Sequence, residues 1–522
     1  MINFDGIRSI SDFARQQAKV RGDATALWFE GRETSFAELD ARSNQIAHAL
    51  IAADVKPGDR VAYLGKNLDR YYEIMLGTAK ARGALAAINN RLAPPEMQFI
   101  ASDAKAKILF VAKEFYETAA DIAEDLPDLK GIIAIDGGHS SWPSYEDVRD
   151  KFPATDPALE EREDDDIIQL YTSGTTGLPK GVMLTNQNYL SYFKQCSELE
   201  WAEYGVAERV MNAMPLFHVA GVNVGLLALA QGAETVVLRD VDPQLILKLI
   251  PERQIQHAFW VPAVILMLTQ MPNVREVDFS TLKQVFYGAS PIAEDLLKDA
   301  REIMDARFTQ LYGLTETVGG GTFLPPEAHD PSWGKLRSCG LPYPGTVVKC
   351  VDSDGNEVAQ GDVGEIVIKS DFVMKGYWHR PEATEEAIRN DFFHTGDAGY
   401  FDEDGFLFIH DRVKDMIISG GENIYPAEVE NAVFGHPDVA DVAVIGVPDD
   451  KWGETVKAIV VVQPGTNPSP EAIIAFTKER IASYKCPKSV DFRDQLPRNP
   501  SGKILRKDLR EAYWGDKQRR VS

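Results

Sequence analysis

Residues 171–181 combine side chains that could bind a polyphosphate. The segment reads Tyr-Thr-Ser-Gly-Thr-Thr-Gly-Leu-Pro-Lys-Gly, and its candidate phosphate ligands are Thr172, Ser173, Gly174, Thr175, Thr176 and Lys180. Glycines let backbone N–H groups approach an anion, hydroxyls donate hydrogen bonds, and lysine neutralises charge. The segment is not a Walker A loop, because Pro179 precedes the lysine and Gly181 follows it. We therefore predict a phosphate-binding loop of another type, in preference to a surface turn of similar composition.

Two further segments carry polar side chains suited to a nucleotide. In residues 312–317, Tyr312 could stack on a base, Thr315 could bond a phosphate oxygen, and Glu316 offers a hard oxygen ligand for Mg²⁺. In residues 394–397, the carboxylate of Asp397 could accept both hydroxyls of a ribose. Each segment is a weak signal alone, because Thr-Glu pairs often cap helices and Asp is common in turns.

Two segments near the C-terminus complete the set. Residues 411–415 and 419–423 connect a predicted hairpin to a small domain, where a hinge could lie. Residues 500–507, Pro-Ser-Gly-Lys-Ile-Leu-Arg-Lys, present Lys503 from a glycine turn near the end of that domain. A terminal basic run is usually a solvated surface, so this lysine gains meaning only together with the other segments.

These segments require a scaffold that brings them together. Apolar runs predict strands at 60–64, 107–112, 131–135, 167–171, 235–238, 258–261 and 284–287. Ser35 and Glu38 form a capping-box pattern that opens a helix toward residue 53, and another helix is expected near 71–80. The alternation of helices and strands predicts an α/β fold with layered, largely parallel sheets.

The pattern changes after about residue 340. Short strands are predicted at 347–351, 365–368, 442–445 and 457–462, a hairpin across 400–409, and a helix at 470–481. A chain of 522 residues exceeds what one hydrophobic core fills. We therefore expect a large N-terminal domain, residues 1–413, and a small α+β C-terminal domain, residues 414–522.

Composition and charge exclude several classes of protein. The net charge of −24 argues against general nucleic-acid binding, which needs a cationic face. The four cysteines form no Cys-x-x-Cys pair, so we expect reduced thiols in a cytoplasmic protein. The N-terminus lacks a signal-peptide pattern, and the most apolar stretch, residues 219–233, is too short to span a bilayer. A homodimer and a peripheral membrane contact are left open.

In this order and at this spacing, the five segments resemble the adenylate-forming superfamily over essentially the whole chain. That family contains acyl-CoA synthetases, peptide-synthetase adenylation domains and beetle luciferases, and has a large N-terminal domain, a small C-terminal domain and a hinge. The phosphate-loop segment and the Gly-Lys pair at residues 502–503 are the most specific signals. The resemblance implies an enzyme that activates a carboxylic acid with ATP.

The resemblance also implies a role for each matching residue. The loop from Thr172 to Lys180 would hold the β- and γ-phosphates, and Glu316 would ligate Mg²⁺ beside the α-phosphate contact of Thr315. Lys503 would bridge the carboxylate and ATP during adenylation. A preorganised cation at this position reduces the repulsion between the two anions. Lys414 matches the hinge. The remaining nucleotide contacts would be Gly288, Ala289, Ser290, Tyr312, Gly313, Asp397 and Arg412.

Two features select the acyl-CoA synthetase branch. Residues 215–221, Pro-Leu-Phe-His-Val-Ala-Gly, lack the Asp that pairs an amino-acid ammonium group in peptide-synthetase domains. Residues 416–426 look like the acyl-CoA synthetase version of the hinge segment, in which Ser419, Gly420 and Gly421 would leave room for the pantetheine of coenzyme A. Many plant hydroxycinnamate ligases have Lys where Ile418 stands and Tyr where Ala220 stands, which argues against that subgroup.

The expected acyl pocket is apolar. We expect it to be formed by Val219, Val222, Val224, Trp260, Val261, Val318, Gly319 and Gly320. The pocket segments contain no Arg or Lys, so apolar monocarboxylic acids are expected, with medium- or long-chain fatty acids favoured. His218 would gate the pocket or orient the thiol, or it is a hydrogen-bonded wall residue. An aryl or arylalkanoic acid–CoA ligase is the main alternative; a luciferase-like oxygenase and a non-catalytic nucleotide-binding module are less favoured.

Overall fold

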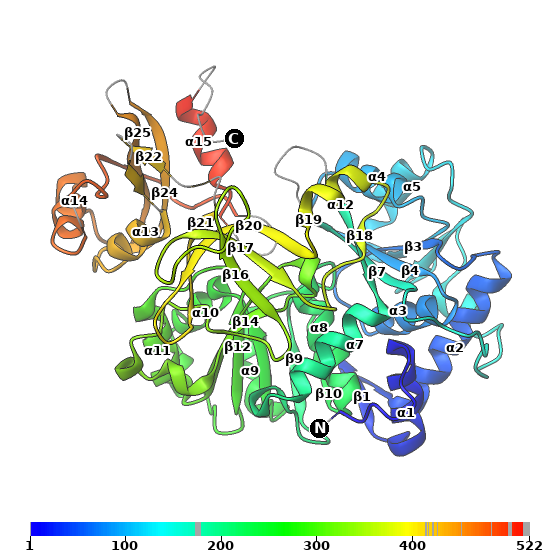
Figure 1. Ribbon diagram of the computed structural model, residues 1–522. Helices are drawn as coiled ribbons and strands as arrows, with labels where there is room; N and C mark the ends of the chain where they lie inside the picture. Colours follow the sequence, from blue (N-terminus) through cyan, green and yellow to red (C-terminus); the bar gives the residue numbers. More distant parts are fainter. Residues whose placement is uncertain are drawn as a thin grey trace.

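The computed structural model describes residues 2–172, 179–412, 415, 417–419, 422–424, 426–449, 452–481, 483–498 and 504–514. Figure 1 shows a large N-terminal part, which holds three sheets, and a smaller C-terminal part at one end. The predicted α/β fold with a large N-terminal and a small C-terminal domain is confirmed.

A seven-stranded sheet carries the strand that leads into the predicted phosphate loop. Its strand order is β18–β8–β7–β4–β3–β5–β6. The strands β7, β4, β3, β5 and β6 are parallel to one another. The strands are β3 (Arg60–Leu64), β4 (Ala84–Ile88), β5 (Ile108–Ala112), β6 (Gly131–Ile135), β7 (Asp166–Thr172), β8 (Lys180–Thr185) and β18 (Gly376–Tyr377). Every residue of β3, β4 and β5 is buried, as expected for a parallel sheet covered on both faces. Its helices are α3 (Arg70–Lys80), α4 (Pro94–Asp103), α5 (Tyr116–Ala123) and α6 (Tyr145–Arg149).

A nine-stranded sheet carries the second nucleotide motif. Its order is β15–β14–β13–β12–β11–β9–β10–β1–β2, with β1, β10, β9, β11, β12 and β13 parallel. The strands are β1 (Thr25–Phe29), β2 (Arg32–Ser35), β9 (Arg209–Asn212), β10 (Glu234–Val237), β11 (His257–Trp260), β12 (Gln284–Gly288), β13 (Arg307–Gly313), β14 (Gly321–Leu324) and β15 (Leu341–Pro342). The accompanying helices are α1 (Ile10–Arg21), α2 (Phe36–Ala52), α7 (Asn186–Ser197), α8 (Val219–Gln231), α9 (Pro243–Glu252), α10 (Pro262–Thr269) and α11 (Glu294–Met304).

Helices α3 and α8 join the two large sheets. Helix α3 contacts β4 and β7, whereas α8 contacts β9 and β10. The two helices meet where Gly225 of α8 faces the Tyr72 ring of α3 so closely that a β-carbon would collide with it. Glycine at this position therefore lets the sheets approach each other.

The remaining strands form two smaller sheets. The third sheet contains β16 (Val347–Val351), β17 (Gly364–Lys369), β19 (Ile388–Arg389), β20 (Phe392–Phe401) and β21 (Leu407–Arg412), with α12 (Pro381–Ala387) beside it. The C-terminal sheet contains β22 (Ile417–Ser419), β23 (Glu422–Ile424), β24 (Val439–Asp449), β25 (Gly453–Val462) and β26 (Ser489–Phe492), with α13 (Pro426–Phe434), α14 (Pro470–Lys478) and α15 (Arg506–Trp514). Single-turn 3₁₀ helices lie at Lys113–Phe115, Glu200–Ala202, Val274–Glu276, Thr315–Thr317, Pro326–His329 and Pro331–Trp333.

The C-terminal part has its own apolar core, built around Ile417, Val429, Val444 and Val456. A separate core is what an independent small domain requires. The predicted hinge residue, Lys414, lies outside the described residues.

Most predicted elements occur where the apolar pattern placed them. The predicted strands 60–64 and 131–135 coincide with β3 and β6, and Ser35 and Glu38 form both hydrogen bonds of the capping box of α2. The predicted helix 470–481 ends earlier, at Lys478. The apolar stretch 219–233 forms α8, and no helix in the described ranges is long and apolar enough to cross a membrane.

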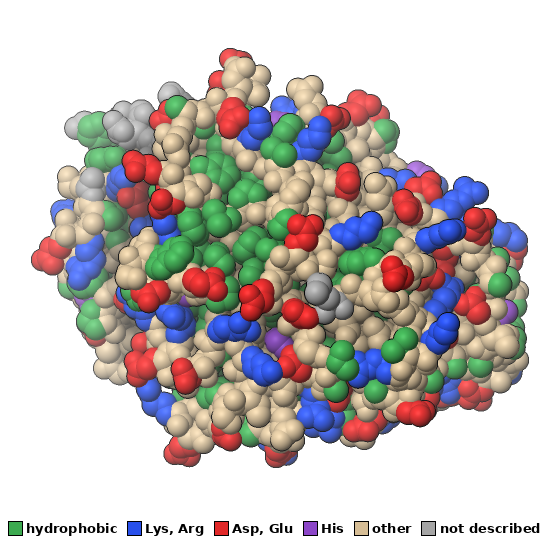
Figure 2. All heavy atoms as spheres, turned by 60° about the horizontal axis from the view of Figure 1, so that its bottom comes forward, with side chains coloured by type: hydrophobic (Ala, Val, Ile, Leu, Met, Phe, Trp, Pro, Cys, Tyr) green, Lys and Arg blue, Asp and Glu red, His purple; other side chains and the backbone are tan. Residues whose placement is uncertain are grey.

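The surface carries mixed charge. On the face drawn in Figure 2, acidic and basic side chains are interspersed with hydrophobic ones, and the basic side chains do not form one continuous area. This face therefore lacks the broad cationic surface that general nucleic-acid binding requires.

Candidate active site

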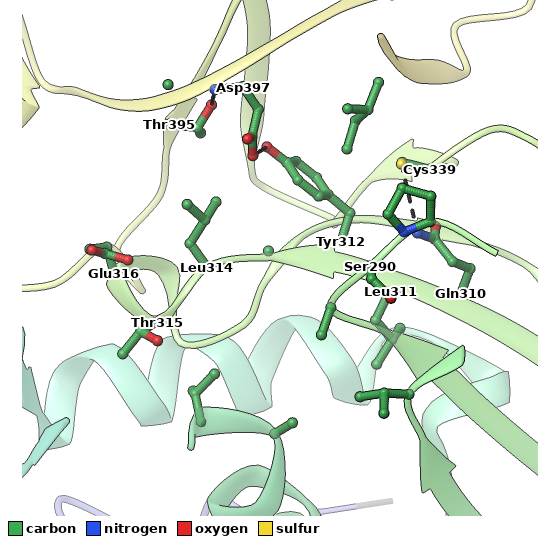
Figure 3. A pocket seen from close by; sticks show the side chains of 18 of the residues that line it. Ser290, Gln310, Leu311, Tyr312, Leu314, Thr315, Glu316, Cys339, Thr395 and Asp397 are labelled. Atoms are coloured by element: carbon green, nitrogen blue, oxygen red, sulfur yellow. Dashed lines mark hydrogen bonds between the residues drawn. The ribbon is translucent and has the colours of Figure 1, made fainter. Parts of the chain in front are cut away.

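One large cavity, of about 1450 Å³, lies where the large sheets, the third sheet and the C-terminal part meet. Many of the predicted site residues line it, although they come from distant parts of the chain. These are Thr172, Lys180, His218, Val219, Val261, Ala289, Ser290, Tyr312, Gly313, Thr315, Glu316 and Asp397. Figure 3 shows that the side chains around Tyr312 and Glu316 extend into a common space.

Parallel strands explain this convergence. Strand β7 ends at Thr172, β12 ends at Gly288 and β13 ends at Gly313. In open α/β sheets, ligands bind beyond the carboxyl ends of the strands. Gly288 and Gly313 are required there for packing, since a β-carbon on either would collide with the backbone of the adjacent segment.

Tyr312 and Asp397 both line this cavity and contact each other directly. The phenol hydroxyl of Tyr312 donates to Asp397 Oδ2 at 2.9 Å, and both side chains are at most 9% exposed. The backbone N–H of Asp397 donates to the hydroxyl of Thr395 at 3.0 Å. Arg412 lies opposite Asp397 in the pairing of β20 with β21, so its backbone is close to the site. The structure thus holds an aromatic ring and a carboxylate side by side, as a nucleoside site requires.

Glu316 lies on a tight turn at the other side of the cavity. Its Oε1 accepts hydrogen bonds from the hydroxyls of Tyr377 at 2.9 Å and Thr172 at 3.4 Å. Val318 follows with φ = 51°, which is unfavourable for a β-branched residue, and its carbonyl accepts a hydrogen bond of 2.7 Å from the Asn223 amide. The rest of the fold therefore holds this turn in a strained conformation.

The donor set around Glu316 fits a magnesium ion that arrives with a nucleotide. Within the described part of the chain, no group of three or more His, Cys, Asp or Glu side chains could hold a metal by itself. Mg²⁺ usually binds through one or two carboxylates, substrate phosphates and water. One buried carboxylate next to two hydroxyl-bearing residues, Thr172 and Thr315, matches that pattern.

His218 precedes α8 and lines the cavity. Its Nε2 atom is buried and has no hydrogen-bond partner among the described residues, so this nitrogen does not belong to a satisfied wall histidine. Burial, with a smaller effect of Arg91, lowers the pKa of His218 to about 4. The imidazole is therefore neutral near pH 7, and its Nε2 atom can form one hydrogen bond with a ligand.

Six of the eight predicted acyl-pocket residues do not line the cavity. Trp260 is fully buried at the end of β11 and points away, whereas the next residue, Val261, faces the cavity. Val261 follows the last residue of β11 and still has an extended backbone, so its side chain projects to the side opposite that of Trp260. The other predicted residues that do not line the cavity are Val222, Val224, Val318 and Gly320, which are buried, and Gly319, which is half-buried.

The structure adds apolar lining residues that the sequence did not identify. They are Met214, Ala220, Val241, Val264, Met267, Ile292 and Leu336. Arg91, which is exposed and lies outside the predicted pocket segments, also borders the cavity. Arg91 comes from the segment after β4, far from the predicted pocket segments in sequence, and no local pattern marked it.

Several predicted residues cannot be compared with the cavity. Ser173, Gly174, Thr175, Thr176, Gly420, Gly421 and Lys503 lie outside the described residues. Ser419 pairs with Gly453 in the C-terminal sheet and is not part of the cavity lining. Arg498 and Arg506, which precede and follow Lys503 in sequence, line the cavity.

Comparisons with known proteins identify the family to which the chain belongs. Residues 14–378 match the model of the AMP-binding enzyme family, and residues 428–503 match the AMP-binding enzyme C-terminal domain. The fatty acid–[acyl-carrier-protein] ligase ScoC of Streptomyces coeruleorubidus is 41% identical over 500 residues, which cover 95% of both chains. A feruloyl-CoA synthase of an Amycolatopsis species is 38% identical, over 95% of this chain and 98% of its own.

Solved structures agree as well. The structure of a Mycobacterium tuberculosis fatty acyl CoA synthetase superposes with a TM-score of 0.75 at 35% identity, covering 97% of this chain and 98% of its own. The chain therefore belongs to the AMP-binding enzyme family, in its acyl-CoA synthetase branch, and is an AMP-forming acid–thiol ligase.

Proposed function

We propose that the protein converts an apolar monocarboxylic acid, ATP and coenzyme A into the acyl-CoA, AMP and pyrophosphate, with medium- or long-chain fatty acids as its substrates. The observation that carries this proposal is the composition of the lining of the 1450 Å³ cavity. Its polar groups suit ATP, and its further walls, from α8, α10 and the segment after β10, are apolar. The boundary between the two domains would lie at Lys414, and the protein would act in the cytoplasm.

The nucleotide contacts follow from the positions of the polar side chains. Tyr312 would stack on the adenine together with Gly288, Ala289 and Ser290, and Asp397 would accept the ribose hydroxyls. Lys180 and the loop after Thr172 would bind the phosphates. Magnesium, held by Glu316 and the phosphates, would neutralise phosphate charge during the reaction.

The chemistry needs no side-chain nucleophile. The substrate carboxylate attacks the α-phosphorus, the bond to pyrophosphate breaks, and an acyl-adenylate forms. Lys503 would reduce the repulsion between these two anions, and the lining of the cavity by Arg498 and Arg506, its neighbours in sequence, supports this role. In the second step the thiol attacks the acyl carbonyl, AMP leaves, and the neutral imidazole of His218 would orient the thiol.

The acyl preference rests on the apolar lining. A buried unpaired charge costs several kcal/mol, and among the described lining residues between Met214 and Ile292 no acidic or basic side chain other than histidine occurs. Ala220 and Val264 leave space for an alkyl chain, and Met267, which is 48% exposed, brings the cavity to the surface at α10. Each methylene that enters should add roughly 0.8 kcal/mol until the pocket is full.

Two alternatives retain the same mechanism. The similarity to a feruloyl-CoA synthase supports an aryl or arylalkanoic acid as substrate. The similarity to ScoC, whose name gives an acyl-carrier protein as acceptor, supports a carrier-protein thiol in place of coenzyme A.

A panel of acids tests the proposal. We would measure thioester formation from acetate through palmitate, benzoate, phenylpropionate, ferulate and succinate, with coenzyme A and with a phosphopantetheinylated carrier protein. Catalytic efficiency should rise with chain length and then level off. Acetate or succinate as the best substrate would contradict the proposed pocket, and ferulate or phenylpropionate as the best would favour the aryl alternative.

Ala220→Phe provides an internal control for the location of the pocket. The added ring should reduce activity on long-chain acids much more than on butyrate, because it narrows the cavity lining. An equal loss for all acids would place the acyl chain elsewhere.

A further inference from the structure

The short segment 374–378, Met-Lys-Gly-Tyr-Trp, connects two parts of the proposed ATP site. Its strand β18 pairs with β8, where Lys375 N donates to Met183 O at 3.1 Å and Trp378 N donates to Gly181 O at 2.8 Å. Its first residue, Met374, donates its backbone N–H to Glu316 O at 2.7 Å. The segment is therefore bonded both to the strand that begins at Lys180 and to the turn that carries Glu316.

Trp378 anchors this segment to the interior. Its indole N–H donates to Asp103 O at 2.9 Å, and the guanidinium carbon of Arg60 lies 3.5 Å from the centre of its ring. Arg60 is 2% exposed and donates to Gln169 at 2.8 Å and to Asp166 at 2.5 Å. The contacts of Trp378 with Asp103 and with buried Arg60 therefore restrict the backbone of the preceding residue, Tyr377.

Tyr377 contacts two charged side chains that line the cavity, Glu316 and Lys180. Its hydroxyl donates to Glu316 Oε1 at 2.9 Å, and Lys180 Nζ lies 5.0 Å from the centre of its ring, within the range of a cation–π contact. The side chain of Tyr377 therefore contacts a carboxylate and an ammonium group at the same time.

We infer that Tyr377 is a positioning residue that orients Glu316 toward the metal ion and Lys180 toward the phosphates. The inference rests on the proposed roles of Glu316 and Lys180. The hydrogen bond from Tyr377 to Oε1 restricts the orientation of the Glu316 carboxylate. The ring supports the lysine ammonium from one side, so the two charges are placed at a fixed separation before ATP binds.

A purely structural tyrosine provides the comparison. Tyr145 donates its hydroxyl to Glu73 Oε2 at 2.7 Å, and both side chains are fully buried. Neither residue lines the cavity. Tyr145→Phe therefore removes the same kind of hydrogen bond without touching the proposed metal site.

The test measures metal binding directly. Binding of Mn²⁺ in the presence of a non-hydrolysable ATP analogue would be followed by electron paramagnetic resonance, in parallel with the Mg²⁺ dependence of ATP–pyrophosphate exchange. Tyr377→Phe should weaken Mn²⁺ binding about tenfold, the scale expected for one hydrogen bond to a charged group, with little change in the Kd of the analogue. Tyr377→Leu should also raise that Kd, because it removes the contact with Lys180. Tyr145→Phe should lower Tm and leave both constants unchanged.

Glu316→Gln tests the proposed metal role of Glu316 separately from the positioning role of Tyr377. If this variant binds Mn²⁺ normally, the proposed metal role of Glu316 is wrong. If Glu316→Gln weakens binding and folded Tyr377→Phe does not, only the positioning role is overturned. Should Tyr377→Phe fail to fold, 4-aminophenylalanine at position 377 would replace the hydroxyl with a weaker hydrogen-bond donor. A Mn²⁺ affinity between those of the wild type and Glu316→Gln would then support the inference. A Mn²⁺ affinity equal to that of the wild type would oppose it.

Discussion

The hydroxyl of Tyr312 donates to Asp397 Oδ2 at 2.9 Å, although 85 residues separate the two in sequence. Each residue belongs to a different nucleotide motif, and the hydrogen bond joins β13 to β20. The proposed adenine contact thereby orients the proposed ribose contact before any ligand binds.

Tyr312→Phe should raise KM for ATP by about tenfold, since a hydrogen bond to a charged group contributes about 1.5–3 kcal/mol and Asp397 loses its fixed orientation. The ring is retained, so stacking should persist and kcat should change less than KM. Steady-state kinetics of ATP–pyrophosphate exchange checks this. Tyr116→Phe is the control, because that hydroxyl donates to the backbone of Ile135 at 2.7 Å and does not line the cavity. An unchanged KM in Tyr312→Phe would show that Asp397 is oriented by other groups.

Lys503→Ala should slow acyl-adenylate formation by at least about a hundredfold, the usual effect of removing one preorganised charge or donor from an active site. Thioester formation from synthetic acyl-AMP should be largely retained, because that step does not need the same cation. Single-turnover measurements of the two half-reactions provide the comparison. Lys507→Ala is the matched control, since its side chain is 75% exposed. Equal losses in both half-reactions would contradict the proposed role.

His329 should make the protein less stable in mild acid. Its Nδ1 lies 2.9 Å from Pro325 O and its Nε2 lies 3.0 Å from the Tyr287 hydroxyl, and burial is the main reason that its pKa falls from 6.5 to about 4. Between pH 6.5 and 4 the unfolded state binds more protons than the folded state, so stability falls as the pH is lowered through this window and the effect ends below pH 4.

His329→Gln can retain both hydrogen bonds but does not titrate. The difference between the wild-type and variant free energies of unfolding should therefore shift by up to roughly 3 kcal/mol between pH 7 and pH 4. Urea denaturation at several pH values measures this difference. A difference that does not vary with pH would mean that His329 is protonated in the folded protein.

Gly225→Ala should destabilise the junction of the two large sheets by about 1–3 kcal/mol, because the new β-carbon forces the Tyr72 ring to move. Tyr72 also accepts a hydrogen bond of 2.8 Å from Asn212, which that movement would break. Thermal unfolding measures the effect. Gly138→Ala is the control, since nothing lies within 4 Å of its added carbon. Equal Tm values for the two variants would show that the junction is not tightly packed.

Local sequence determined much of this protein. Buried parallel strands such as β3 are continuous apolar runs, and the capping box of α2 is a contact between residues three apart, so both can be read from neighbouring residues. The nucleotide motifs lie at strand ends, which explains why Thr172, Tyr312 and Glu316 meet in one cavity.

Which side chains line the rest of the cavity depends on contacts between distant parts of the chain. Trp260 and Val261 are adjacent and both apolar, yet one is packed in the interior and the other faces the cavity, because strand direction sets which side each residue takes. Arg91 reaches the cavity border, and Tyr377 reaches Glu316, from segments whose local patterns carry no sign of it. Contacts between residues far apart in sequence depend on how whole sheets pack, and no local pattern contains that information.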